Sequence, residues 1–176
     1  MLPRPEPPGY RASQMRDLFS FPNPVNETSA RVVAGSVAVL AVLTIAFQQG
    51  WLLPVLAYGF IARTLTGPTL SPLGQLATRV VTPRLNVRHR YSPGPAKRFA
   101  QAVGALFTVV ATVLYYGAGQ HVAAYALLGV IVVFASLESV FGLCVGCKAF
   151  FLGMRLGLVP PSVCEDCARV LVGDAA

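Results

Sequence analysis

Charged residues are scarce in this chain of 176 residues: Asp, Glu, Lys and Arg make up 12% of it, whereas hydrophobic residues make up 55%. A soluble globular domain carries about 25% charged residues, so this chain has too little polar surface to cover a globule of its size in water. Disordered chains are poor in apolar residues, which excludes that class as well. The scarcity of charge therefore predicts a small integral membrane protein.

Cysteine is scarce too. Four cysteines in the whole chain are too few for a secreted miniprotein held together by disulfides, in which cysteine exceeds about 8%. A cleaved signal peptide is not expected either, because the first apolar stretch begins only at Val32, behind a Pro-rich segment, whereas signal peptides begin within a few residues of the N-terminus.

Apolar stretches are what the sequence has in abundance. Four predicted spans lie near residues 31–47, 51–65, 99–119 and 122–143. A spanning helix needs about 20 apolar residues; the last two stretches reach that length and the first two are shorter. Backbone polar groups in hydrocarbon must be bonded internally, so all four are expected to be helical. The predicted fold class is an all-α membrane protein with about four transmembrane helices in two hairpins, and a re-entrant hairpin over residues 31–62 is the alternative.

Basic residues collect between the two hairpins. Residues 63–98 contain seven Lys and Arg and no acidic residue, whereas the turns at 48–50 and 120–121 contain no Lys or Arg. The positive-inside rule therefore predicts that this loop and both termini are cytoplasmic. The loop has no aromatic stacking platform, so anionic lipids of the inner leaflet are its expected partner and nucleic acid is not. Ser71-Pro72 begins a predicted short amphipathic helix, which either lies on that leaflet or packs on the bundle.

Three segments are predicted along the chain. Residues 1–30 form a Pro-rich cytoplasmic N-terminal segment, residues 31–147 form the helical membrane domain with its basic loop 63–98, and residues 148–176 form a cytoplasmic tail. A bundle of four short helices is expected to leave little room inside, which is compatible with a homodimer.

Glu138 is the one acidic residue inside an apolar stretch. A carboxylate at the bilayer centre costs about 2.5–3.5 kcal/mol, so such residues tend to face the bundle interior and to be functional. Glu138 lies roughly 7 Å before the end of its span. A structural ion pair and proton handling beside the cysteines both stay open. The second role requires a break near Gly142, because Glu138 and Cys144 do not share a face of a continuous helix. Three polar side chains are expected within reach of Glu138: Arg63, Arg98 and Gln101.

All four cysteines lie near the C-terminus, in two Cys-x-x-Cys pairs: Cys144 with Cys147, and Cys164 with Cys167. Their spacing matches a four-cysteine zinc site and also paired thiol–disulfide motifs. On the expected topology both pairs face the reducing cytoplasm, where permanent structural disulfides are disfavoured. Redox chemistry and metal binding both stay open.

Charges near the cysteines bear on this choice. Lys148, one turn after Cys144, would favour a thiolate, and a helix that begins near Cys144 would favour it further. Glu165 and Asp166 place negative charge beside the thiolates of a zinc site and disfavour it. Redox chemistry is therefore the first interpretation, and zinc is the alternative cofactor.

Three motifs carry a resemblance to a known family. They are Arg63-x3-Gly67-Pro68-x2-Ser71-Pro72, Lys97-Arg98-Phe99-Ala100-Gln101, and Leu137-Glu138-x3-Gly142-x-Cys144-Val145-Gly146-Cys147-Lys148. Together they resemble the bacterial membrane-protein family catalogued as domain of unknown function 4395, over roughly Val25 to Lys148. The resemblance implies a small helical protein of the bacterial inner membrane, with Cys144 and Cys147 as the family's cysteine pair and Glu138 as its acid. Genes of similar proteins often lie beside those of thioredoxin-like or rhodanese-like proteins, which implies a partner of that kind.

Three functions are expected from these observations. The first is a membrane thiol-redox or sulfur-handling accessory: Cys144 would be the nucleophile, Cys147 the resolving thiol, and Cys164 with Cys167 a second pair, exchanging with a soluble partner through a mixed disulfide. The second is a non-catalytic scaffold whose tail is folded by zinc on the four cysteines. The third is a small transporter of a sulfur compound, which would need a polar path that the scattered Ser, Thr and Gln of the first three spans scarcely provide.

Overall fold

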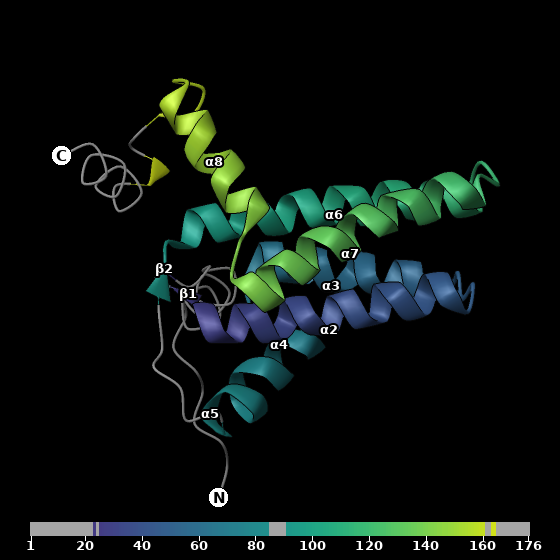
Figure 1. The fold of residues 1–176 in the computed structure, drawn as a ribbon, viewed down its shortest axis with the longest axis horizontal. Coiled ribbons are helices and arrows are strands. Elements are labelled where there is room, and N and C mark those ends of the chain that lie inside the picture. Colours follow the sequence, from purple (N-terminus) through teal and green to yellow (C-terminus); the bar gives the residue numbers. More distant parts are fainter. Residues whose placement is uncertain (1–22, 24, 85–90, 161–162, 165–176) are drawn as a thin grey trace, which may run out of the picture.

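Helices make up nearly all of the part of the chain that the computed structural model describes, which is residue 23 and residues 25–84, 91–160 and 163–164 (Figure 1). Two helix pairs are each joined by a tight turn: α2 (Glu27–Ala46) with α3 (Leu52–Thr66), and α6 (Gly94–Tyr116) with α7 (His121–Phe141). The last helix, α8 (Val145–Arg155), follows α7. Between the pairs lie α4 (Pro72–Gln75), the π-helical η1 (Leu76–Val81) and α5 (Thr82–Arg84).

A two-residue strand pair ties the starts of α2 and α6 together. Strand β1 (Val25–Asn26) pairs antiparallel with β2 (Tyr91–Ser92), with Val25 opposite Ser92. The side chain of Asn26 then accepts a hydrogen bond of 3.0 Å from the backbone N–H of Thr28 and so caps α2, as Asn commonly does at a helix start. Both helix pairs therefore begin at the same end of the bundle.

The four long helices run side by side, but the packing does not follow the chain order (Figure 1). The main contacts of α2 are with α7, and those of α3 are with α6, while α6 and α7 also pack on each other. Alanine dominates where the helices meet, as at the fully buried Ala41, Ala111 and Ala124. Small side chains let helix backbones approach closely, which is the usual packing mode in membranes.

The outer faces of the bundle are apolar. Val39, Leu106 and Val133, one from each of three long helices, are 59%, 61% and 55% exposed. Three helices are long and apolar enough to cross a membrane, namely α2, α6 and α7, and α3 is a shorter apolar helix. At 1.5 Å per residue the three long helices measure about 30–35 Å, which matches a hydrocarbon core of about 30 Å. The chain is therefore a predominantly helical membrane protein, as its composition predicts.

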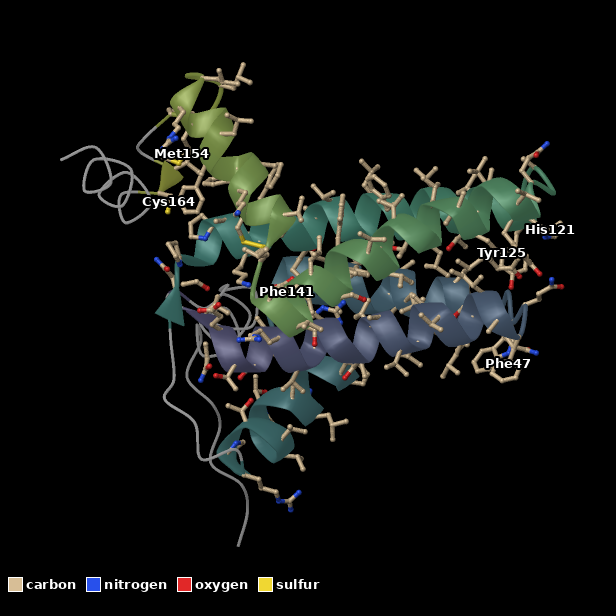
Figure 2. All side chains as sticks on the ribbon, in the orientation of Figure 1. Phe47, His121, Tyr125, Phe141, Met154 and Cys164 are labelled. Atoms are coloured by element: carbon tan, nitrogen blue, oxygen red, sulfur yellow. A yellow bond between two sulfur atoms is a disulfide. The ribbon has the colours of Figure 1, made fainter. Side chains whose placement is uncertain are left out.

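The end of the bundle that holds the two tight turns lacks charge and gathers tyrosine side chains. The turns 47–51 and 117–120 contain no charged residue. Figure 2 shows His121 and Tyr125 at that end. The ring of Tyr115 contacts both of them, at centroid distances of 4.3 and 5.8 Å. Tyrosine gathers where membrane meets water, so this end has the character of an interface.

The helix bounds differ from the predicted spans in one informative place. Helix α6 begins at Gly94 rather than at residue 99, because Pro95 sits in its first turn, where a missing N–H has no helical partner to lose. The predicted start of this span near residue 99 is therefore too late. This earlier start places Lys97 inside the helix.

The basic loop contains the expected short helix, and it is longer than predicted. Ser71 caps it by accepting a 3.3 Å hydrogen bond from the N–H of Gly74, and helical structure continues to Arg84. The loop helix packs on the bundle, where the hydroxyls of Thr82 and Ser29 lie 2.9 Å apart. At the other end of the chain, α8 runs across the predicted boundary between residues 147 and 148. The N-terminal segment lies outside the described residues up to residue 22.

Candidate functional site

The polypeptide breaks its helix between Glu138 and the first cysteine pair. Gly142 ends α7 in the left-handed conformation, with φ of 70°, and its N–H donates to the Glu138 carbonyl at 3.0 Å. Glycine adopts this conformation without steric cost and is the usual residue after a helix. The chain then turns, so the interpretation in which α7 runs through to Cys144 is wrong and the interpretation with a new helix at Cys144 holds.

Cys144 caps the new helix. Its Sγ accepts a hydrogen bond of 3.2 Å from the backbone N–H of Cys147, and α8 begins at the next residue. Cys144 and Cys147 are joined in a disulfide, and none of the cysteines within the described residues is a free thiol. When this disulfide is reduced, the positive end of the helix stabilises a thiolate at Cys144.

Gly146 lets the cysteine turn lie directly on α6. A Cβ at this position would come 2.7 Å from Cα of Ala100, a distance that real Cβ contacts do not reach, so only glycine fits without a shift of one helix. One turn further along α8, Phe150 packs on Phe99 with ring centroids 5.6 Å apart. The sulfur pair is thus held against the first half of α6.

Glu138 forms its ion pair with Lys97, and the side chains are 16% and 6% exposed respectively. Lys97 was not among the expected partners. Of those that were, Arg63 and Gln101 line the same cavity as Glu138, whereas Arg98 faces outward and its Nε donates to the Thr64 carbonyl at 3.0 Å. Neighbouring residues on a helix point about 100° apart, so a shift of one position changes which side chain meets the carboxylate. A charge pair at this depth is stable because each member compensates the other.

Arg63 is a second buried charge at the same end of the bundle, with 5% of its surface exposed. Its Nε donates to Oε1 of Gln101 at 3.0 Å, its Nη1 donates to Oγ of Ser71 at 3.1 Å, and its guanidinium carbon lies 4.7 Å from the ring centroid of Phe60. The sequence predicted Arg63 only as a partner of Glu138, and its hydrogen bonds to Gln101 and Ser71 were missed. The position of Arg63 at the end of an apolar stretch could have indicated a buried arginine with polar partners.

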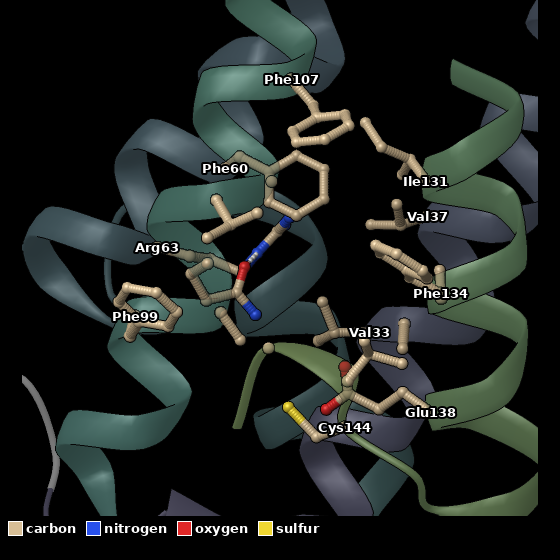
Figure 3. A pocket seen from close by; sticks show the side chains of 18 of the residues that line it. Val33, Val37, Phe60, Arg63, Phe99, Phe107, Ile131, Phe134, Glu138 and Cys144 are labelled. Carbon is tan, nitrogen blue, oxygen red and sulfur yellow. Dashed lines mark hydrogen bonds between the residues drawn. The ribbon is translucent and has the colours of Figure 1, made fainter. Parts of the chain in front are cut away.

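These groups meet at a cavity of about 350 Å³ between α2, α3, α6 and α7 (Figure 3). Figure 3 shows Cys144 and Glu138 at one end of it and aromatic rings toward the other. The expectation that a bundle of short helices leaves little room inside is wrong, because small residues line part of the wall. The lining includes Val33, Val37, Phe60, Phe99, Phe107, Ile131 and Phe134 as large apolar residues, Ala34, Ala100, Gly104 and Ala135 as small ones, and Arg63, Gln101, Glu138 and Cys144 as polar ones.

A smaller cavity of about 180 Å³ lies on the other side of Arg63. Its polar lining comes from Asn26, Ser29 and Lys97. Arg63 and Gln101 line both cavities. Arg63 and Lys97 are two cations, and Glu138 is one carboxylate. Together these three side chains carry a net positive charge.

The remaining predicted site residues lie on α8 or after it. Lys148 is exposed on α8, and Cys164 is buried in a small apolar cluster with Ala96 and Phe150, against which Cys147 also packs. Cys164 and Cys147 thus contact the same apolar cluster, while Cys167 lies outside the described residues. No group of three or more potential metal ligands occurs within the described ranges, a search that does not include Cys167.

Comparison with known families agrees with the motifs. The model of a family described as domain of unknown function (DUF4395) matches residues 25–155. The chain belongs to this family. The DUF4395 match begins at β1 and ends with α8, so it includes the cavity, Glu138 and the first cysteine pair but not Cys164. No curated protein and no solved structure matches the chain.

Proposed function

We propose that this chain is a membrane thiol-redox protein whose working group is the Cys144–Cys147 pair. The observation that carries the proposal is the placement of this pair. It is joined at the start of a helix and held on α6 through Gly146, and Cys144 lines a cavity that Glu138 also lines. The helix end stabilises the thiolate of Cys144, so Cys144 is the sulfur that readily enters a mixed disulfide and is readily released from it.

Four membrane spans in two hairpins suit this proposal best. Helix α3 measures only about 22 Å, but it packs along α6 and presents Val55, Tyr58 and Ile61 outward, each exposed in the absence of lipid. With the basic loop in the cytoplasm by the positive-inside rule, the cysteine pair would lie at the cytoplasmic face of the bacterial inner membrane, and both termini would be cytoplasmic. Anionic lipids would contact the basic segment.

The exchange would follow ordinary thiol–disulfide chemistry. A thiolate of a thioredoxin-like or rhodanese-like partner attacks Sγ of Cys144, a new S–S bond forms between the two proteins, and Cys147 leaves as a thiolate. The second thiol of the partner then attacks its own sulfur in this mixed disulfide, which releases Cys144. The partner ends oxidised, and the Cys144–Cys147 pair ends as a dithiol.

A trapping experiment tests this function. In Cys147→Ser, the thiolate of Cys144 attacks the disulfide of an oxidised thioredoxin-like partner and forms a mixed disulfide, while the second sulfur of the partner leaves as a thiolate. Because no Cys147 thiol releases the partner, this mixed disulfide is expected to accumulate. Non-reducing electrophoresis of native membranes should show the adduct, and a reductant should remove it. The matched Cys144→Ser variant should form none. Equal adduct in both variants, or none in either, would contradict the proposal.

A four-cysteine zinc scaffold is the second candidate, favoured by the packing of Cys164 in the same apolar cluster as Cys147. A tetrahedral site of four thiolates is a common structural zinc site. Metal content of the purified full chain separates the two functions. About one zinc per chain, lost in each single Cys→Ser variant, would replace the redox function with the scaffold.

A further inference from the structure

We propose that the 350 Å³ cavity binds the ring of a lipid-soluble quinone, which accepts the electrons of the Cys144–Cys147 dithiol. This inference rests on the proposed thiol-redox function and names the acceptor that returns the pair to its disulfide. It is argued from the walls of the cavity, its hydrogen-bond donors and its position beside the sulfur atoms.

The walls select an apolar, flat molecule. Phe60, Phe99, Phe107 and Phe134 come from three helices and line the cavity together with aliphatic side chains (Figure 3). Aromatic rings favour a flat ring as a partner through offset or edge contacts. Helices that face lipid surround this space, so a ligand dissolved in the bilayer reaches it more readily than a charged, water-soluble one.

The volume of the cavity further restricts which class of ligand fits. Small-molecule sites span about 300–1,000 Å³, and about 350 Å³ is at the small end of that range. The space suits one substituted ring, with an isoprenoid chain left in the bilayer between helices. A dinucleotide or a flavin nucleotide is too large for it and carries phosphates that its apolar walls do not match.

Two donors at the polar end of the cavity fit a quinone carbonyl. Arg63 uses Nε and Nη1 for Gln101 and Ser71, and its Nη2 donates no hydrogen bond within the described residues. The amide oxygen of Gln101 accepts from Arg63, so its amide nitrogen is likewise left to donate. A neutral carbonyl is a suitable acceptor here, and reduction places negative charge on the same oxygen, which the guanidinium stabilises.

Glu138 supplies the proton route. It lines the cavity as Cys144 does (Figure 3), and its carboxylate is also paired with Lys97. In the reaction two S–H bonds break and one S–S bond forms between Cys144 and Cys147. The two electrons and two protons released pass to the two oxygens of the quinone and give the quinol. Glu138 takes a thiol proton and passes it on, so nothing else is consumed.

The test uses the purified full-length chain, reduced and freed of reductant, without oxygen. The probes are decylubiquinone and a short-chain menaquinone, and quinol formation and thiol loss are followed together. The wild type is expected to form one quinol for each thiol pair lost, with a rate that saturates in quinone. Trapping of the thioredoxin-like partner by Cys147→Ser is measured separately and without quinone, so failure of the acceptor and failure of the thiol exchange are distinguishable.

A matched pair of variants locates the reaction in the cavity. Val103 lines the cavity from α6, so Val103→Trp fills it and is expected to slow quinol formation about tenfold. Val110 lies two turns along the same helix, outside the cavity and 39% exposed, and Val110→Trp should leave the rate unchanged. Gln101→Leu should raise the KM for quinone more than it lowers kcat.

Three outcomes would overturn the inference. One is partner trapping without any quinol formed by the wild type. Another is an equal rate loss in Val103→Trp and Val110→Trp. The last is binding of an inorganic anion such as thiosulfate in place of quinone, detected when the anion competes with quinone for the site at Arg63. This outcome would assign the cavity to a sulfur oxyanion.

Discussion

Lys97 and Arg98 are neighbours with opposite surroundings. The ammonium of Lys97 meets the carboxylate of Glu138 at 6% exposure, whereas Arg98 is exposed and bonds one carbonyl. Removing one member of a buried pair leaves an uncompensated charge, so Lys97→Gln is expected to lower the free energy of unfolding by about 3 kcal/mol. Arg98→Gln should cost less than about 1 kcal/mol. Denaturant unfolding in detergent micelles measures both.

A double variant shows whether the charge itself is responsible. Replacing the pair by Lys97→Met with Glu138→Leu removes both charges, and it should recover a large part of the stability that Lys97→Gln loses. Equal destabilisation by Lys97→Gln and Arg98→Gln would show that the pair is not buried as described.

At the residue scale, the sequence singled out Glu138 and Cys144, and the structure places both at one cavity, but the ion-pair partner of Glu138 was not foreseen. An acid in an apolar stretch is visible in the sequence, whereas its partner depends on where α6 begins and therefore on which face Lys97 occupies. The place of Arg63 beside Gln101 needs the packing of α3 on α6, which periodicity alone does not determine.

At the scale of the element, α8 offers two glycines in different surroundings. A Cβ at Gly146 would meet Cα of Ala100 at 2.7 Å, whereas a Cβ at Gly153 would meet only Val159 at 3.5 Å, an ordinary contact. We expect Gly146→Ala to lower the free energy of unfolding by about 1–3 kcal/mol, because α8 and α6 must separate. Gly153→Ala should raise it by up to about 1 kcal/mol through helix propensity.

Thermal unfolding of the two variants in the same detergent checks the opposite signs. An increase in stability for Gly146→Ala would mean that the first turn of α8 does not lie on α6, and the site built on that contact would then have to be abandoned.

The break at Gly142 that begins this element was foreseen as one of two interpretations. The length of the loop helix was not foreseen, since Pro83 lies inside α5 and proline usually interrupts a helix.

For the whole molecule, the number of spans and their direction can be read by labelling. Gln49 and Gln120 lie in the two turns at the uncharged end, and Lys148 is exposed on α8 at the other end. In a chain whose native cysteines are replaced by Ser, we expect Gln49→Cys and Gln120→Cys to react with an impermeant maleimide in spheroplasts, and Lys148→Cys to react only after the membrane is opened.

The three positions serve as controls for one another. Labelling at Gln120→Cys but not at Gln49→Cys would identify α2 and α3 as a re-entrant hairpin, and labelling of Lys148→Cys from outside would reverse the orientation.

The membrane class could be predicted from composition alone, and the helix pairs from the four apolar stretches. The cavity could not, because it depends on which small side chains face one another across helices from both halves of the chain.

The cross-wise packing has a consequence for how the protein is made. Helices α2 and α3 pack mainly on α7 and α6 and far less on each other, yet they leave the ribosome first. Until α6 arrives with Gln101, the guanidinium of Arg63 lacks one of its two hydrogen-bond acceptors and keeps only the hydroxyl of Ser71, beside the ring of Phe60. A nascent chain halted before α6 is therefore an incompletely assembled product, and quality-control proteases of the membrane would recognise it by that unshielded cation.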